Sequence, residues 1–260
     1  MNDELIKMLK YLRLAGLLEN WDRYLGMART QNFSHVRLLQ YIIEQEYKIK
    51  KDNARRLRIA RAKIPEKYVM ETFPFKRQPK LNRKKLLGLY DSFDYMSKNQ
   101  NIIWIGPTGV GKTGLATAFL MHAIDHEYKG RFILFPELIE MLYQSVADHS
   151  EAKVMNTFVS YDCLLIDEVG YVQIEPVQVG LFFTMMKKRH RTKTTLITSN
   201  LGFSQWTSFL KNDNLTAALM DRLTENSHII NMKNCVSLRK KLDQAYNCFH
   251  KQVYRVVKHI

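Results

Sequence analysis

The sequence predicts an α/β fold with a five-stranded parallel sheet flanked by helices, preceded by a small all-helical N-terminal domain. Three observations lead to this prediction. Apolar residues recur at helical spacing in the first part of the chain, and short apolar segments alternate with helical ones in the second part. In addition, a glycine-rich motif separates the first of these apolar segments from a helical pattern.

The N-terminal domain is expected to span residues 1–70. Its apolar residues recur at i, i+3, i+4 and i+7 from Leu5 to Leu12 and again from Leu14 to Trp21. Ser34 is a candidate N-cap for a further, longer helix. The whole domain is therefore predicted to be helical.

The second domain is expected to span residues 98–260. Prolines at positions 65, 74 and 79 interrupt a segment without clear periodicity, so residues 71–97 are interpreted as a linker that leads into this domain. The predicted strands are Ile102–Ile105, Arg131–Phe135, Cys163–Asp167, Thr194–Ser199 and His228–Met232. The basic C-terminal residues are expected to form a helix.

Charge is distributed unevenly along the chain, which has a net charge of +15. Residues 1–100 contain 22 Lys and Arg against 11 Asp and Glu, and residues 239–260 contain 6 against 1. The segment between them is nearly neutral, with 12 against 13. Basic flanks around a neutral core are typical of a protein that binds a polyanion. The alternative is a solvated surface with a favourable net charge.

A basic run in the N-terminal domain supplies the candidate DNA contacts. It consists of Lys48, Lys50, Lys51, Arg55, Arg56, Arg58, Arg61 and Lys63, and only Asp52 interrupts it. The sequence has no zinc-finger spacing and no clear base-reading helix. We therefore expect contacts with phosphates and deformation of double-stranded DNA to dominate, with low sequence specificity.

The sequence favours a soluble, cytoplasmic protein over a secreted or membrane protein. Charged residues occur throughout the first ten positions and no apolar segment follows them, unlike in a signal peptide. The longest apolar runs are far shorter than the roughly 20 residues of a membrane span. The three cysteines have no zinc-binding spacing and are expected to be reduced thiols.

The glycine-rich motif predicts a site for ATP. The residues Gly106, Pro107, Thr108, Gly109, Val110, Gly111, Lys112 and Thr113 match the P-loop pattern G-x-x-x-x-G-K-[ST]. Its glycines let the backbone turn tightly around an anion, so that N–H groups and a helix N-terminus face the phosphates. Lys112 would reach the β- and γ-phosphates, and the Thr113 hydroxyl would be a ligand of Mg²⁺.

A second motif predicts hydrolysis. The apolar strand that begins at Cys163 ends in Asp167 and Glu168, which is typical of a Walker B motif. Asp167 would hold Mg²⁺, and Glu168 would act as the general base that activates water. Because a small-molecule kinase needs no activated water, the adjacent glutamate favours hydrolysis over phosphoryl transfer.

Three further polar residues are candidates for the catalytic site. Asn200 follows the next strand and could orient the attacking water or contact the γ-phosphate, although asparagine at this place is often a turn residue. Arg222 and Arg239 flank the last strand, and either could supply positive charge to the transferring phosphoryl group, although both could be ordinary surface residues.

Together these motifs resemble those of the IstB family, the transposition helper ATPases of bacterial insertion sequences, which are similar to the helicase loader DnaC. The resemblance covers nearly the whole chain. It is carried by the P-loop, Asp167–Tyr171, Thr198–Asn200, Asp221–Leu223 and Ser237–Arg239, and in the N-terminal part by Leu12–Gly16, the basic helix from Glu44 to Arg61, and Ala62–Pro65.

The resemblance implies an AAA+ P-loop NTPase with the P-loop strand central in the sheet. Asn200 would be sensor 1, Arg239 the sensor 2 contact, and Arg222 the arginine finger that reaches a neighbour's ATP in a homo-oligomer. The family assembles with ATP on duplex DNA, deforms the target site and recruits a transposase, whose arrival stimulates hydrolysis.

Two departures and two alternative functions accompany this interpretation. Gly114 stands in place of the usual histidine after the P-loop, and residues 234–236 replace a glycine-containing approach to Arg239.

The ATPase motifs fit a DnaC-type helicase loader equally well. A non-catalytic DNA-binding module with a structural nucleotide is a third hypothesis, against which Glu168 and Arg222 argue.

Overall fold

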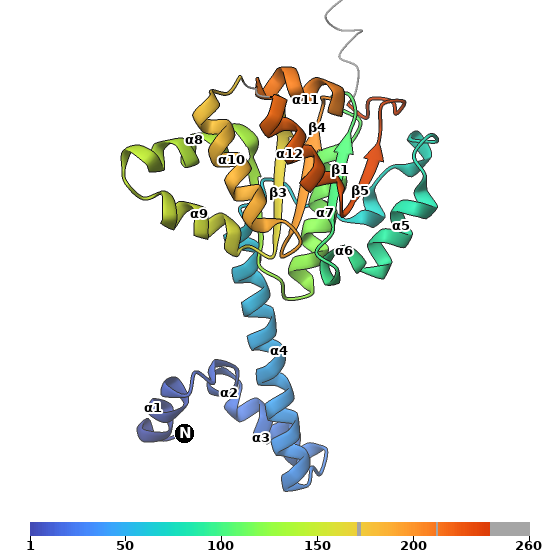
Figure 1. Ribbon diagram of the computed structural model, residues 1–260. Helices are drawn as coiled ribbons and strands as arrows, with labels where there is room; N and C mark the ends of the chain where they lie inside the picture. The colour runs from blue at the N-terminus through green and yellow to red at the C-terminus, as the bar shows by residue number, and fades with distance from the viewer. Residues whose placement is uncertain (171–172, 212, 240–260) are drawn as a thin grey trace, which may run out of the picture. The chain divides into compact units, whose positions relative to one another are not determined.

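The computed structural model describes residues 1–170, 173–211 and 213–239 (Figure 1). They form two compact units that divide between Arg61 and Ala62. The sequence suggested a boundary near residue 70, but Met70, Leu81 and Leu86 are buried side chains of the second unit. The predicted basic C-terminal helix lies outside the described residues, as does Tyr171.

The first unit is helical, as predicted. It contains α1 (Asp3–Tyr11), α2 (Ala15–Glu19), α3 (Trp21–Thr30) and α4 (His35–Ala62). The Ser34 hydroxyl accepts the Arg37 N–H at 3.3 Å, which confirms that Ser34 caps α4. The Leu17 N–H donates to the buried carboxylate of Glu46, and this bond ties α2 to α4.

The second unit contains a parallel sheet of five strands. They are β1 (Asn101–Ile105), β2 (Gly130–Leu134), β3 (Cys163–Val169), β4 (Thr194–Ser199) and β5 (Ser227–Asn231), in the order β2-β3-β4-β1-β5. The predicted sheet is thereby confirmed. The central position of the P-loop strand is not, because β1 lies between β4 and the edge strand β5. Phe135 begins a helix instead of ending a strand.

Helices cover both faces of this sheet (Figure 1). They are η1 (Met70–Thr72), η2 (Phe75–Arg77), α5 (Arg83–Ser92), α6 (Asp94–Ser97), α7 (Lys112–Asp125), α8 (Phe135–Ala147), α9 (Glu151–Ser160), α10 (Pro176–Arg189), α11 (Phe203–Leu210) and α12 (Asp213–Thr224). On one face Trp104 of β1 packs against Phe119 of α7, and the other face packs against α8 to α12. Strands β1 to β4 are buried on both faces, as is usual in parallel sheets, whereas the edge strand β5 is only partly buried.

Arg189 is a buried cation at the end of α10. Its guanidinium donates to the main-chain oxygens of Phe158 and Tyr161 at the end of α9, both at 2.8 Å, and of Thr194 at the start of β4, at 2.6 Å. Burial lowers the pKa of Arg189 to about 10, so the group stays protonated at neutral pH. Arg189 therefore connects three elements at the end of the sheet where the strands begin.

None of the helices that the structure describes is both long and apolar enough to span a membrane.

Candidate nucleotide-binding site

The P-loop connects β1 to α7 and depends on its glycines. Gly109 and Gly111 have φ angles of +83° and +97°, a region that side chains with a Cβ rarely adopt. At Gly106 a Cβ would lie 2.8 Å from the main chain of Met232, so glycine is needed there for close approach. Because α7 begins at Lys112, its first N–H groups and the positive end of its dipole lie at this loop.

Lys112 is buried in the P-loop. Its ammonium group donates to the main-chain oxygens of Gly106 at 2.7 Å and Pro107 at 2.8 Å. Burial lowers the pKa of Lys112, while the charges of Asp167 and Glu168 act in the opposite direction. A bound phosphate could replace these carbonyl oxygens as the partner of the ammonium group.

Asp167 lies next to Thr113, as predicted for a pair of metal ligands. The Thr113 hydroxyl donates to the two Asp167 carboxylate oxygens at 3.0 and 3.2 Å, and the Thr198 hydroxyl donates to the same carboxylate. Burial raises the pKa of Asp167, although these hydrogen bonds oppose the shift. Mg²⁺ prefers one or two carboxylates together with phosphate oxygens. The chemistry of this donor set therefore fits Mg²⁺.

Glu168 lies at a β-bulge that redirects its side chain. In a regular strand two successive side chains point to opposite faces, so adjacent carboxylates would not share a site. Here the pairing of β3 with β4 shifts between Ile166 and Val169, and Glu168 has a φ of +63°. Its N–H donates to the Thr198 hydroxyl at 3.0 Å. Glu168 is consequently exposed toward the cavity, while Asp167 is buried.

The site residues surround a cavity of about 370 Å³, a size typical of small-molecule sites. Its polar wall includes Thr108, Lys112, Thr113, Glu168, Thr198, Asn200 and Arg239. A second, mostly apolar wall is formed by Tyr68, Val69, Thr72, Phe73 and Pro74. Sequence reasoning missed this second wall, whose aromatic residues lie within the segment that is interrupted by prolines. Polar and apolar walls together suit a phosphate chain and a planar base.

Asn200 and Arg239 also line the cavity, as expected from the sequence. The side-chain oxygen of Asn200 is buried and has no hydrogen-bond partner among the described residues. Arg239 is held near the P-loop because the Leu238 N–H donates to the Gly109 oxygen at 2.7 Å. A donor such as a water molecule in the cavity would satisfy the Asn200 oxygen.

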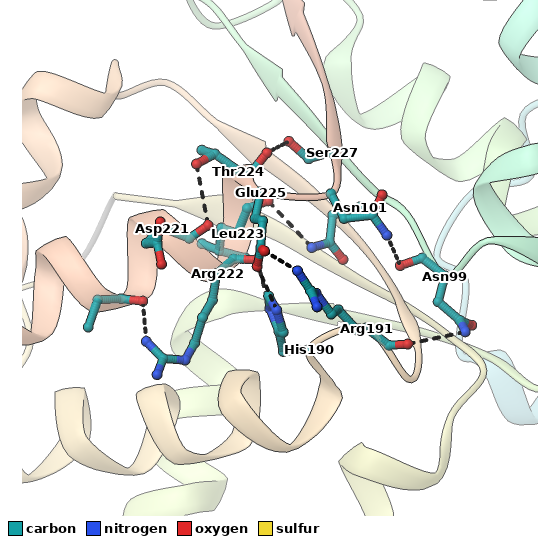
Figure 2. Close-up of polar contacts among 12 residues, drawn as sticks. Asn99, Asn101, His190, Arg191, Asp221, Arg222, Leu223, Thr224, Glu225 and Ser227 are labelled. Atoms are coloured by element: carbon teal, nitrogen blue, oxygen red, sulfur yellow. Dashed lines mark hydrogen bonds and ion pairs between the residues drawn. The ribbon is translucent and has the colours of Figure 1, made fainter.

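Arg222 does not line this cavity, and Figure 2 shows it among polar contacts that include Asn101, the first residue of β1. Its guanidinium donates to Ala218 of its own helix at 2.7 Å and lies 5.2 Å from the ring centre of Phe183. The neighbouring Leu223 oxygen accepts from Asn101, the first residue of β1. The five residues of β1, at about 3.3 Å each, separate this end from the P-loop by roughly 16 Å. Arg222 is therefore out of reach of its own chain's nucleotide site.

The predicted DNA contacts follow α4 to its end. Lys48, Lys50, Lys51, Arg55, Arg56, Arg61 and Lys63 are exposed, and Arg58 is partly buried. Sequence reasoning missed a second cationic segment in the other unit, formed by Lys76, Arg77, Lys80, Arg83, Lys84 and Lys85. All six are exposed, and within the described part of the chain none of them forms an ion pair.

Solved structures share the fold of the second unit. The crystal structure of DnaI has a TM-score of 0.51 at 22% identity and covers 57% of this chain and 84% of that one. DnaA from Aquifex aeolicus, bound to AMPPCP, has a TM-score of 0.52 at 18% identity. The match covers 65% of this chain and 51% of that one. At these identities the likeness shows the fold alone, that of an AAA+ P-loop protein.

Sequence relatives extend over most of the chain. The ATP-binding protein of insertion sequence IS5376 from Geobacillus stearothermophilus is 30% identical and covers 85% of this chain and 88% of that protein. The ATP-binding protein of IS21 from Pseudomonas aeruginosa is 28% identical, and the match covers 88% of this chain and 86% of that protein. The family model described as IstB-like ATP binding protein matches residues 7–245. The chain therefore belongs to the IstB-like ATP-binding proteins of insertion sequences.

Proposed function

We propose that this protein hydrolyses ATP with Mg²⁺ and uses its nucleotide state to control assembly on duplex DNA, where it remodels a target site and recruits or activates a transposase. The observation that carries the proposal is the convergence of Lys112 and Glu168 at one cavity, with the Asp167 carboxylate hydrogen-bonded to Thr113 in the cavity wall. Its relatives, which are named as ATP-binding proteins of insertion sequences, support the link to transposition.

Each polar residue has a defined task in hydrolysis. Lys112 and the N–H groups of the P-loop bind the phosphates and neutralise their charge. Mg²⁺, held by Thr113 and Asp167, would neutralise further charge on the phosphate oxygens. Glu168 accepts a proton from the attacking water, and the unpartnered oxygen of Asn200 accepts a hydrogen bond from the same water and orients it.

A second subunit completes the site in this proposal. Arg222 is too far from its own cavity, so its positive charge acts on the nucleotide of a neighbour. The ATP sites then lie at the subunit interfaces of a homo-oligomer. Hydrolysis consequently requires assembly. ATP would then be hydrolysed only after the subunits have assembled on DNA.

Two exposed cationic segments support DNA binding. The first follows α4 from Lys48 to Arg61 and continues to Lys63, and the second runs from Lys76 to Lys85. Each cation that contacts a phosphate releases condensed counterions, which favours binding independently of sequence. The second segment directly follows the cavity wall of residues 68–74, so nucleotide binding has a short path to a DNA-binding surface.

A helicase loader is the second candidate function. The DnaC helicase loader shares the fold, with a TM-score of 0.50 at 21% identity. In that role the same ATPase would place a ring helicase on single-stranded DNA, and the N-terminal helices would bind the helicase.

The two functions differ in the DNA they require. We would measure binding of the purified protein to duplex and single-stranded DNA with ATP, ADP or no nucleotide, at two salt concentrations, while following particle mass. A salt-sensitive, high-mass complex that forms on duplex DNA only with ATP is expected. Binding to single strands or to a helicase alone, in every nucleotide state, would favour the loader instead.

A further inference from the structure

Gln78 is a buried amide side chain that connects two parts of the nucleotide site. It follows η2, and only 1% of its surface is exposed. Its side-chain nitrogen donates to the Val110 oxygen at 3.0 Å and to the Val236 oxygen at 2.7 Å. Its side-chain oxygen accepts the Val236 N–H at 3.0 Å. The amide nitrogen and oxygen are therefore both engaged by main-chain groups.

The bonded main chain leads directly to two nucleotide contacts. Val110 lies in the P-loop and precedes Lys112 by two residues, while the chain after Val236 reaches Arg239 in the cavity. Among the residues that the structure describes, the main-chain bond from Leu238 to Gly109 joins these two segments without Gln78. Gln78 therefore supplies most of the polar connection between the P-loop and the segment that carries Arg239.

We infer that Gln78 is a positioning residue, which couples residues 236–239 to the P-loop and so holds Arg239 at the bound triphosphate. This inference rests on the proposed function, since it requires that the cavity binds ATP. Gln78 does not touch the nucleotide, because it does not line the cavity. Its effect on binding is exerted through Arg239.

The amide of Gln78 is needed because it both donates and accepts hydrogen bonds at a buried position. An apolar side chain of similar length would fill the same volume, but it would leave the oxygens of Val110 and Val236 without their partner. The segment that carries Arg239 would then lose its two hydrogen bonds to Gln78 and keep only the bond from Leu238 to Gly109 as its connection to the P-loop. Once Arg239 itself is removed, however, residues 236–239 no longer carry a charged group for Gln78 to position, so the two losses should not multiply.

The test is a double-mutant cycle on the full chain with Gln78→Met, Arg239→Ala and the double variant. The readout is equilibrium binding of a fluorescent ATP analogue with Mg²⁺. Each single variant is expected to weaken binding about tenfold, and the double variant by about the same factor instead of about a hundredfold. Gln100→Met is the matched control, because Gln100 contacts His228 at 2.9 Å near the opposite end of the sheet. It should bind like the parent protein.

The outcomes separate this inference from the proposed function. Losses that multiply in the double variant, or parent-like binding by either single variant, would overturn the role of Gln78. Neither result would contradict the proposal that the cavity binds ATP. A parent protein that binds no nucleotide would overturn the proposed function as well. If Gln78→Met loses its folded circular dichroism spectrum, the neutral but shorter amide of Gln78→Asn replaces it in the same cycle, with the same expected coupling.

Discussion

The two compact units differ in how their residues serve function. In the second unit the candidate chemical groups sit among buried side chains and main-chain hydrogen bonds that fix their position. In the first unit only a few side chains, such as Leu9, Tyr24 and Glu46, are buried, and the candidate DNA contacts lie on the surface of one helix. A nucleotide site built on fixed geometry should fail when one group changes. A surface that acts through summed charge should weaken gradually.

The largest effect is expected for Arg222→Ala. If Arg222 completes a neighbour's site, ATP should still bind, but turnover on DNA should fall by about a thousandfold. A mixture with Lys112→Ala subunits should regain activity, because those subunits lack a functional ATP site but keep Arg222. Steady-state phosphate release from each variant and from the mixture tests this. A mixture as inactive as its components would contradict a role for Arg222 in trans.

Glu168→Gln should separate turnover from binding. The substitution removes the proton acceptor but keeps the side-chain size, so phosphate release should fall by about 10²- to 10³-fold while ATP affinity is retained. Lys112→Ala should instead lose ATP affinity. Single-turnover hydrolysis and analogue binding distinguish the two variants. Parent-like hydrolysis by Glu168→Gln would exclude this residue as the base.

Arg189→Met tests whether the second unit depends on buried polar contacts away from the cavity. The change leaves the oxygens of Phe158, Tyr161 and Thr194 without their donor, so the free energy of unfolding should fall by about 3 kcal/mol. Urea unfolding measures this. Arg191→Met is the control, because that arginine is largely exposed and its ion pair with Glu225 should contribute about 1 kcal/mol or less. Equal destabilisation by both variants would contradict the conclusion that the buried hydrogen bonds of Arg189 stabilise the second unit.

The smallest effects are expected for paired replacements of surface cations. Lys48→Ala with Lys50→Ala in the first unit, and Lys84→Ala with Lys85→Ala in the second, should each reduce the slope of log K against log salt by about 1.8. Lys187→Ala with Lys188→Ala removes the same charge from the end of α10 and should leave the slope unchanged. Titration of a fluorescent duplex at several salt concentrations measures the slope. Equal effects of all three pairs would show that only net charge matters.

Much of the fold and part of the site could be predicted from local sequence patterns. Each strand of the sheet contains an apolar run, although in β4 and β5 it is only two residues long, and the P-loop motif specifies the identity and spacing of its own residues. The order of the strands has no such local signal, and the position of β1 next to the edge strand was accordingly not predicted.

The remainder of the site depends on contacts between segments distant in sequence. The bulge at Glu168 arises from its pairing with Thr198 of another strand, and regular alternation would have sent this carboxylate to the opposite face. Gln78 binds main-chain groups, which any residue type can supply, so its partners leave no trace in the sequence. The cavity wall of residues 68–74 was missed because aromatic residues in a segment without periodicity reveal no packing partner.

If Arg222 completes the site of a neighbouring subunit, as proposed above, its position at the far end of β1 has a kinetic consequence. An isolated subunit would bind ATP but could not supply its own arginine, so the hydrolysis rate per subunit would increase with protein concentration until assembly is complete. A dilute pool would consequently remain loaded with ATP. Assembly itself would then determine when hydrolysis begins. The time for which a complex stays bound to ATP would start when its subunits associate.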